Sequence, residues 1–400
     1  EHQKGKQGLR VRLTVDTEVQ KACGKLLNDR AGSISVMDIY TGDIIAMYSS
    51  PSYDPNKFLF GISNDDWALI RNNPLKPLVN KTLSGLYSPG STIKPIVALS
   101  ALENKIVSPS FKVKCTGKME LYGQTFHCWK EKGHGFVSLK NAMKQSCDTY
   151  FYEVARLLGV DRLNVTAEKF GLGKKVLGDY FDFEKSGLFP NTKWKKNNLG
   201  KGWVLGETLI TGIGQGYTQT TPLQLCLMTA QIANGGYSIK PRIIVDNNPM
   251  PIEEIKKKLK EETLHSQEKK LFKDPRNIKI VQEAMFSSTN ELYGTSYKSR
   301  IDDPKYQFAG KTGTAQVKRI SMRERELDLK IEQIPYKDRD HALYIAYGPY
   351  INPRYALSII VEHGGSGSRT AAPIAKELFK LIIDRNDLRN KQKNFEEIKI

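Results

Sequence analysis

A serine and a lysine three residues apart open the apolar run "SPGSTIKPIVALSALE" at residues 88–103. On a helix, side chains three residues apart share one face, so Ser91 and Lys94 are expected to lie side by side. Burial lowers the pKa of a lysine, and a neutral amine can accept the proton of a serine hydroxyl. A helix N-terminus also offers free backbone N–H groups to a developing oxyanion. The pair indicates a nucleophile and its base, although a capping serine beside a surface lysine fits the same letters.

Two further motifs hold polar side chains that could join such a site. "SCD" places Ser146 and Asp148 at the junction of two predicted helices, and "GKTGTAQ" lies on a predicted strand. The glycine of "GKTGTAQ" leaves room for a substrate backbone, and the threonine hydroxyl groups of this motif can donate to a carboxylate. The residues concerned are Lys311, Thr312, Gly313 and Thr314. Each motif alone has an ordinary explanation, as a helix cap or as a strand with a glycine.

The cysteines suggest a second kind of chemistry. Five cysteines are an odd number in a long chain, which argues against a disulfide scaffold. Three of them lie with a histidine within 33 residues: Cys115, Cys128, His134 and Cys147. Three thiolates and one imidazole fill a tetrahedral structural zinc site. The spacing is not that of a zinc finger, so buried free cysteines with a surface histidine, or a Cys115–Cys128 disulfide, remain alternatives.

Composition excludes several classes of protein. The 400 residues are 39% hydrophobic and 26% charged, as in a globular protein with a real core. No apolar run reaches the length of a membrane span, and no signal peptide is visible at the start. The net charge is +18, but the lysines alternate with glutamates in segments such as "EEIKKKLKEE", which is typical of a solvated face. We therefore expect no nucleic-acid partner.

The order of elements predicts the architecture. "GSISVMDIYTGDIIAMYSS" reads as a hairpin, and three strand-like runs with a closing helix follow residue 307. Residues 9–15 read as another strand, residues 51–90 mostly as loop, and residues 318–341 as a charged, mobile insertion. A mostly helical lobe occupies roughly residues 92–290. This order predicts one α+β domain with a central antiparallel sheet built from both chain ends and flanked by helices.

The three motifs occur here in the order named for penicillin-binding proteins and class A β-lactamases. The chain resembles the transpeptidase domain of the class B penicillin-binding proteins, and "LTVDTEVQKA", "GIGQGYTQTTPLQL" and "CWKEKGHG" with "SCDTYFYEVA" resemble their elongation branch. The resemblance covers nearly all 400 residues. It implies a β-lactamase-like serine transpeptidase fold over residues 1–400 and a peptidoglycan D,D-transpeptidase acting in cell elongation and shape maintenance. A membrane anchor and a pedestal would be absent from this chain.

The resemblance also assigns roles to single residues. Ser91 would attack the D-Ala-D-Ala peptide bond, Lys94 would act as base, and Ser146 would relay a proton to the leaving amine. Lys311 would complete the positive cluster, and the hydroxyl groups of Thr312 and Thr314 would hold the carboxylate of the donor peptide or of a β-lactam, with Gly313 leaving room beside them. The backbone N–H groups of Ser91 and Thr314 would form the oxyanion hole.

Asp148 departs from the general motif, which has Asn at this position. An ionised Asp cannot donate a hydrogen bond to a substrate carbonyl, so it could instead pair with a lysine. Some elongation-type relatives carry zinc on Asp, Asp, His and Cys ligands, and Cys115 and Cys128 would replace the two Asp residues. The zinc would then bind Cys147, which faces away from the substrate, and clamp the second motif.

The same resemblance implies partners and a location. We expect peptidoglycan stem peptides and β-lactams as ligands, with a membrane-embedded glycosyltransferase and a scaffold protein as partners. The full-length protein would be anchored by a single span in the inner membrane, with this domain in the periplasm. Two alternatives stay open: a D,D-carboxypeptidase or β-lactamase that passes the acyl group to water, and a non-catalytic β-lactam sensor.

Overall fold

The computed structural model describes residues 8, 11–245, 251–265, 270–318 and 331–397. A five-stranded antiparallel sheet lies at its centre, in the order β2-β1-β9-β8-β7. The N-terminal hairpin supplies β1 (Gly32–Asp38) and β2 (Ile44–Ser50). The C-terminal part supplies β7 (Ala309–Ala315), β8 (His341–Gly348) and β9 (Tyr355–Val361). The predicted α+β class and the sheet built from both chain ends are confirmed.

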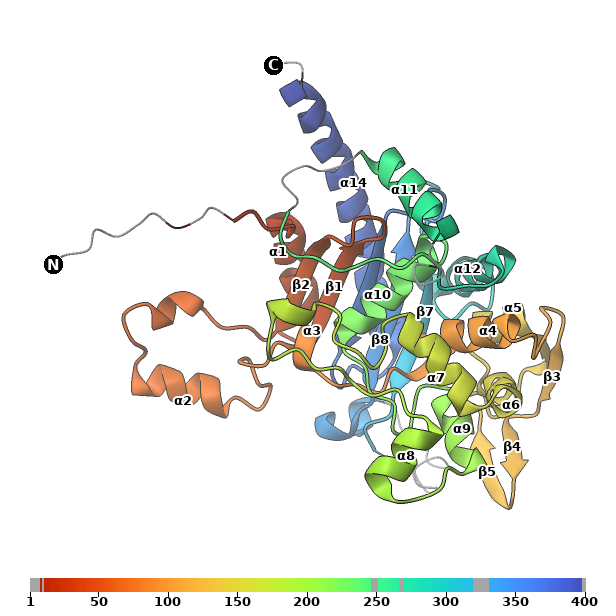
Figure 1. The fold of residues 1–400 in the computed structure, drawn as a ribbon. Helices are drawn as coiled ribbons and strands as arrows, with labels where there is room; N and C mark the ends of the chain where they lie inside the picture. Colours follow the sequence, from red (N-terminus) through yellow and green to blue (C-terminus); the bar gives the residue numbers. More distant parts are fainter. Residues whose placement is uncertain (1–7, 9–10, 246–250, 266–269, 319–330, 398–400) are drawn as a thin grey trace.

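Helices cover both faces of this sheet, which explains why β1 and β9 are buried along their whole length. On one face, α1 (Thr17–Leu27) packs against α14 (Ala372–Glu397) and the sheet. On the other face, α10 (Pro222–Ala233) crosses the strands, as Figure 1 shows. Thr221 caps α10 and Pro222 occupies its first turn, which fixes where the helix begins. The helix is apolar on all sides and is buried along its whole length.

β7 is an edge strand, and the helical lobe lies beside it (Figure 1). The lobe contains α4 (Lys94–Glu103), α5 (Leu139–Lys144), α6 (Asp148–Leu158), α7 (Val160–Lys169), α8 (Thr192–Leu199), α9 (Leu205–Thr211) and α12 (Pro275–Asn290). A further helix, α11 (Ile252–His265), lies apart from them, near α14 in Figure 1. The lobe also contains two small two-stranded sheets that the sequence did not reveal. In one, β3 (Lys112–Cys115) pairs with β6 (Gly135–Ser138), and in the other, the hairpin of β4 (Lys118–Leu121) and β5 (Gln124–His127) lies between them in the chain. Their four-residue strands are too short to show a clear alternating pattern.

One sequence-based prediction is wrong. Residues 11–15 do not form a strand, because their only pairing among the described residues is an isolated bridge between Leu13 and Ile244. Residues 51–90 are mostly loop, as predicted, although α2 (Asn64–Asn72) and the short α3 (Lys81–Ser84) both begin at side-chain caps within them. Of the insertion, residues 319–330 lie outside the described residues, so its predicted mobility stays a prediction.

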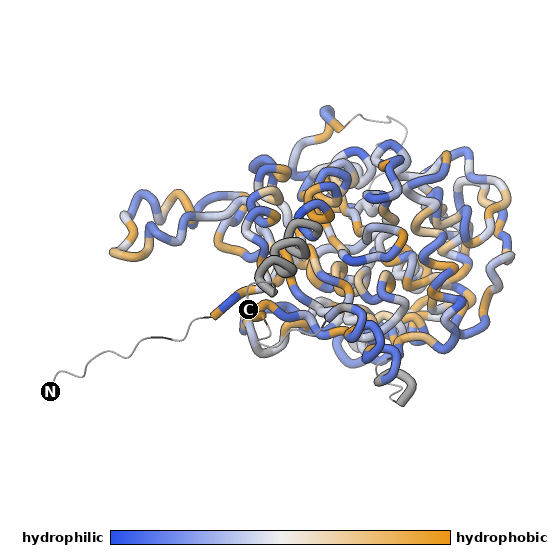
Figure 2. Tube along the Cα trace, turned by 90° about the horizontal axis from the view of Figure 1, so that it is seen from above, coloured by the Kyte–Doolittle hydropathy of each residue, from blue (hydrophilic) through white to orange (hydrophobic). Residues whose placement is uncertain are grey.

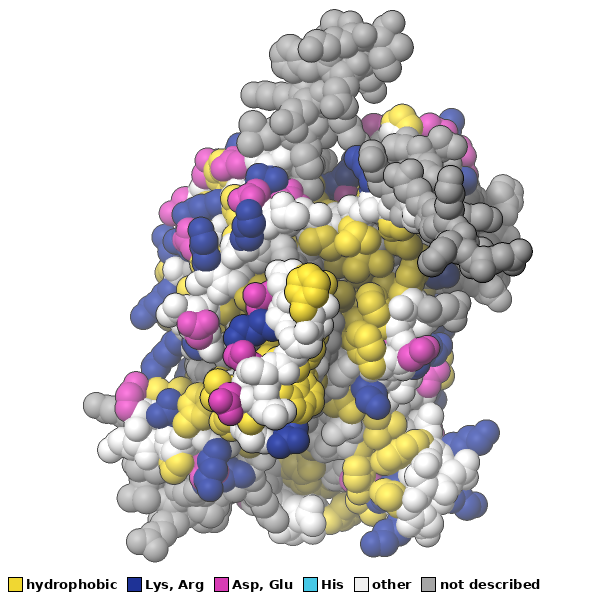
Figure 3. Space-filling model, turned by 90° about the vertical axis from the view of Figure 1, so that its left-hand side faces the viewer, with side chains coloured by type: hydrophobic (Ala, Val, Ile, Leu, Met, Phe, Trp, Pro, Cys, Tyr) yellow, Lys and Arg dark blue, Asp and Glu magenta, His cyan; other side chains and the backbone are white. Residues whose placement is uncertain are grey.

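Residues 51–80 form an arm that projects from the body of the molecule in both Figure 1 and Figure 2. The arm exposes large apolar side chains, among them Leu59, Phe60 and Leu69. Figure 3 faces this side of the molecule and shows hydrophobic side chains gathered there. Within the described part of the chain, no helix is both long enough and apolar enough to cross a bilayer.

Candidate active site and metal centre

The first motif lies in a tight turn that precedes the helix. Gly90 has a φ of 54°, a left-handed conformation that favours glycine, and its N–H donates to the carbonyl of Gly214 at 2.9 Å. Ser91 lies in a 3₁₀ turn, Gly90–Ile93, and α4 begins only at Lys94. Residues 91 to 94 are therefore wound more tightly than the α-helical turn that the sequence predicts. The backbone N–H of Lys94 donates to the carbonyl of Ser91 and closes this 3₁₀ turn.

The third motif packs directly against this turn. A Cβ on Gly313 would lie 2.7 Å from Cγ2 of Thr92, and a Cβ on Gly90 would lie 2.6 Å from the carbonyl oxygen of Thr314. Both positions need glycine because the backbone of β7 and the turn touch. Two segments more than 200 residues apart in sequence therefore meet at the edge of the sheet.

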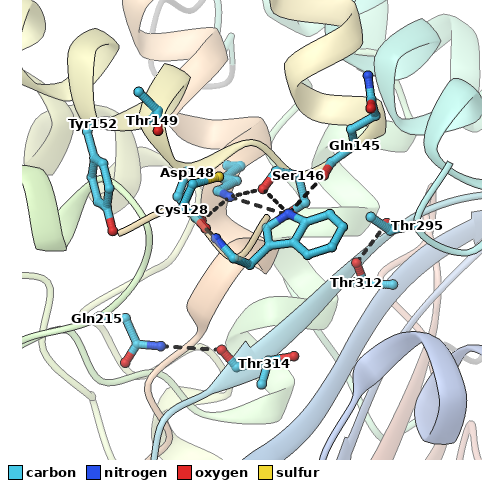
Figure 4. Close-up of polar contacts among 12 residues, drawn as sticks. Cys128, Gln145, Ser146, Asp148, Thr149, Tyr152, Gln215, Thr295, Thr312 and Thr314 are labelled. Carbon is cyan, nitrogen blue, oxygen red and sulfur yellow. Dashed lines mark hydrogen bonds and ion pairs between the residues drawn. The ribbon is translucent and has the colours of Figure 1, made fainter. Parts of the chain in front are cut away.

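The second motif lies between the two lysines. Lys94 Nζ donates to Ser146 O at 3.0 Å and to Ser146 Oγ at 3.2 Å, and Lys311 Nζ donates to Ser146 Oγ at 2.8 Å. Figure 4 shows Ser146 and Asp148 on one side of the site and Thr312 and Thr314 on the other. Ser146 has a φ of 55°, and such strain in a residue other than glycine is typical of functional sites.

The electrostatics of this cluster come from two buried lysines and one carboxylate. Both lysine side chains are 0% exposed, and Lys94 forms an ion pair of 2.7 Å with Asp148. Burial, and then the nearby charge of Lys94, hold the pKa of Lys311 well below its usual value. The structure gives this lowered pKa for Lys311, for which the sequence did not predict it. Lys94, for which the sequence predicted it, forms the ion pair with Asp148.

Asp148 is fully occupied by partners within the protein. One carboxylate oxygen accepts from Lys94, and the other accepts from the backbone N–H of Trp129 at 3.0 Å. The pairing with a lysine agrees with the alternative considered for this departure from the Asn of the general motif. Asp148 holds Lys94 in place through these contacts.

Three residues that the sequence analysis did not single out also belong to the site. Thr295 accepts from the hydroxyl of Thr312 at 2.8 Å, and Gln215 donates to the carbonyl of Thr314 at 3.3 Å. Trp129 contacts the second motif through both its backbone and its indole. No local motif marks Thr295. Gln215 lies in "GIGQGYTQTTPLQL" and Trp129 in "CWKEKGHG", the two runs that carried the resemblance, so these two could have been suspected.

The four predicted metal ligands form one cluster. The Sγ atoms of Cys115, Cys128 and Cys147 and a ring nitrogen of His134 all lie within 4.8 Å of one another. His134 Nδ1 is 3.5 Å from Cys115 Sγ and 3.6 Å from Cys128 Sγ. Zinc bonds of ~2.3 Å to sulfur and ~2.0 Å to nitrogen place tetrahedral ligands about 3.5 Å apart, so these distances fit the metal.

The charges of the cluster also suit a cation. A hydrogen bond with Cys147 is the largest cause of a lowered pKa at Cys128, and the same contact raises the pKa of Cys147. The lowered pKa favours the thiolate form of Cys128, which is the form that binds a metal ion. All five cysteines are free, so the Cys115–Cys128 disulfide considered as an alternative is not formed.

Comparison with known proteins gives one consistent family. Residues 32–380 match the family model of the penicillin binding protein transpeptidase domain. The chain is 35% identical over 381 residues to the peptidoglycan D,D-transpeptidase MrdA of Salmonella typhimurium, and the match covers 94% of this chain and 59% of that relative. The chain therefore spans about three fifths of the length of this curated relative.

Solved structures agree with this match. The Pseudomonas aeruginosa PBP2 solved in complex with WCK 5153 has a TM-score of 0.79 and 38% identity, covering 93% of this chain and 78% of that one. The Helicobacter pylori PBP2 solved in complex with MreC has a TM-score of 0.77 and 30% identity, covering 95% of this chain and 64% of that one. Both likenesses extend over nearly the whole fold.

Proposed function

Because the chain belongs to the class B penicillin-binding proteins, on the penicillin-binding protein 2 branch, we propose that it is a peptidoglycan D,D-transpeptidase that crosslinks stem peptides during cell elongation and shape maintenance. The observation that carries this proposal is the meeting of three distant motifs in one buried cluster. Ser146 receives hydrogen bonds from both Lys94 and Lys311, beside the turn that holds Ser91.

In the proposed reaction, Lys94 is the neutral amine when Ser91 Oγ attacks the carbonyl carbon of the D-Ala-D-Ala bond. Lys94 takes the proton of Ser91 and, as the resulting cation, is stabilised by the carboxylate of Asp148. The backbone N–H groups of Ser91 and Thr314 stabilise the oxyanion. The peptide bond then breaks, the terminal D-Ala leaves with a proton relayed through Ser146, and an ester to Ser91 remains. The amine of a second stem peptide attacks this ester, so a crosslink forms and Ser91 recovers its proton.

Lys311, Thr312 and Thr314 support the binding step. The buried charge cluster provides donors near the carboxylate of the donor peptide, and Gly313 lets β7 lie against the turn that holds Ser91, because a Cβ there would be 2.7 Å from Cγ2 of Thr92. A β-lactam would enter by the same route and remain as a stable acyl-enzyme. An edge strand with an open side is a common way to bind an extended peptide.

We also propose that Cys115, Cys128, His134 and Cys147 hold a structural zinc ion. Zinc would fix the turn of the second motif to the loop between β5 and β6, because Cys147 lies between Ser146 and Asp148. A site with four protein ligands leaves no open position for substrate, which makes the metal structural and leaves the acyl-transfer steps to the side chains.

The proposal extends to location and partners. The likeness to the Helicobacter pylori protein solved with MreC supports a partner of that kind, and the family supports a membrane-embedded glycosyltransferase as a second partner. In the full-length protein, this domain would lie in the periplasm on an inner-membrane anchor.

Mass spectrometry after treatment with a fluorescent penicillin tests the central claim. We expect a mass gain of one drug molecule on the peptide that contains Ser91, and no gain in Ser91→Ala. A label on another residue, or no label, would contradict the proposal. Release of the label within seconds would favour a β-lactamase or carboxypeptidase instead. A cell whose wall crosslinking is unchanged by Ser91→Ala would favour the sensor.

A further inference from the structure

The indole of Trp129 forms a hydrogen-bonded bridge to the second motif. Its Nε1–H donates to Gln145 O at 3.1 Å and to Ser146 O at 3.1 Å. Both acceptors lie at the end of α5, where the last carbonyl groups of a helix have no partner within the helix. The indole therefore supplies a donor that this helix end needs, from a loop that lies 16 residues earlier in the chain.

Ser146 depends on this donor more than an ordinary helix end would. Its backbone is left-handed, with a φ of 55°, and its carbonyl is shared between Trp129 Nε1 and Lys94 Nζ. A strained residue keeps its conformation only when several contacts determine it. The indole N–H thus orients the residue whose hydroxyl receives both lysines.

The same tryptophan holds the second motif at another point. Its backbone N–H donates to Asp148, which in turn pairs with Lys94. The indole is anchored by its nitrogen, and an edge contact with His134 supports it at a ring centroid distance of 5.4 Å. Yet Trp129 stays 59% exposed, so its side chain remains accessible to solvent beside Ser146.

We propose that Trp129 has two separable tasks in the reaction proposed above, on which this inference rests. Its indole N–H is a positioning group for Ser146 and Lys94, and its exposed ring is an apolar wall that binds the incoming donor peptide or β-lactam. The first task acts on the rate of acylation, and the second acts on binding. Neither task requires Trp129 to exchange a proton.

Three variants separate these tasks. Trp129→Phe keeps a ring but removes the donor, Trp129→Gln keeps an N–H donor but removes the ring, and Trp129→Ala removes both. Stopped-flow acylation with a fluorescent penicillin gives the maximal rate constant and the half-saturating concentration for each variant. Zinc content and melting temperature are measured on the same samples.

We expect Trp129→Phe to lower the maximal rate constant about tenfold, with a half-saturating concentration close to that of the wild type, because a hydrogen bond to a strained carbonyl is lost. Trp129→Gln should keep most of the rate constant and raise the half-saturating concentration about fivefold, because the apolar wall is lost. Trp129→Ala should show both changes.

Trp203→Phe is the matched control. The indole of Trp203 donates to the hydroxyl of Thr208 at 2.8 Å, between α8 and α9, without a described contact to the three motifs. Its removal should leave both acylation constants within twofold of the wild type.

Unchanged acylation constants in Trp129→Phe would overturn the positioning role. So would equal loss of rate in Trp129→Gln and Trp129→Ala, and this comparison decides the point if Trp129→Phe does not fold. A wild-type protein that is not labelled on Ser91 would instead refute the proposed transpeptidase function, so the two failures are distinguishable.

Discussion

Two clusters share one short segment of this chain and are built in opposite ways. Ser146 and Asp148 belong to the catalytic cluster with Lys94 and Lys311, whereas Cys147 belongs to the cysteine cluster. The catalytic cluster joins hydroxyl and charged groups by hydrogen bonds next to an open strand edge. The cysteine cluster joins thiols and an imidazole in a set that could close around one ion.

This difference shows how one turn can serve two purposes. Neighbouring side chains point in different directions, so residues 146 and 148 can face the active site while residue 147 faces the other cluster. A metal ion would stabilise the turn without entering the reaction. The catalytic cluster is accordingly expected to respond to substitution mainly in rate, and the cysteine cluster mainly in stability.

Loss of Lys94 should give the largest effect. Lys94→Ala removes the proposed base and leaves Asp148 without its cation, so we expect acylation by a fluorescent penicillin to fall about 10³-fold or more. Stopped-flow fluorescence measures the rate, and urea unfolding measures the stability.

Lys195→Ala is a matched control, because Lys195 is also buried and paired with a carboxylate, that of Glu207, outside the three motifs. Both substitutions should lower the unfolding free energy by about 3 kcal/mol or less, because each removes the cation from a largely buried pair whose carboxylate keeps some contact with solvent. Only Lys94→Ala should abolish acylation, and equal acylation losses in the two variants would contradict the proposed role of Lys94 as the base.

Disruption of the cysteine cluster should come next. Cys128→Ala should remove bound zinc and lower the unfolding free energy by several kcal/mol, because metal binding contributes directly to folding. Cys226→Ala, at a buried cysteine outside the cluster, should keep the zinc and cost about 1–2 kcal/mol. Metal analysis and thermal unfolding check both, and equal behaviour of the two variants would argue against the metal centre.

A pH series should reveal the buried amine of the catalytic cluster. The folded pKa of Lys311 lies below its unfolded value, so between these two values the unfolded chain binds more protons and stability rises with pH. Wild-type protein should gain stability relative to Lys311→Met by up to about 1.4 kcal/mol per pH unit within this window. Urea unfolding from pH 6 to 10 measures the difference, and a constant difference would contradict the lowered pKa.

The smallest effect is expected at the strand edge. Gln215→Ala frees the carbonyl of Thr314, an acceptor on the open side of β7, from an exposed hydrogen bond. Acylation by a penicillin that carries a side-chain amide should rise about two- to threefold, since such a bond contributes ~0.5 kcal/mol.

Gln282→Ala provides the comparison, because its amide also bonds a main-chain carbonyl, that of Ile232, but in another part of the lobe. This variant should affect stability and leave acylation unchanged. Slower acylation in Gln215→Ala would indicate that Gln215 binds the substrate itself.

The sequence by itself determined the identity of the groups that could react. Serine, lysine and threonine side chains in three ordered motifs, and three cysteines with one histidine, are chemical facts of the chain. Hydrophobic periodicity also predicted the hairpin, the buried α10 and the strands at the C-terminal end, because local pattern and burial agree in these elements.

Only the tertiary structure decided how those groups are paired. The ion pair between Lys94 and Asp148, the 3₁₀ turn at Ser91 and the indole bridge of Trp129 join residues far apart in sequence or depend on backbone angles. Local pattern cannot report such contacts, because they depend on which surfaces the packed core brings together. Burial then changes the chemistry of each group, as the lowered pKa of Lys311 shows.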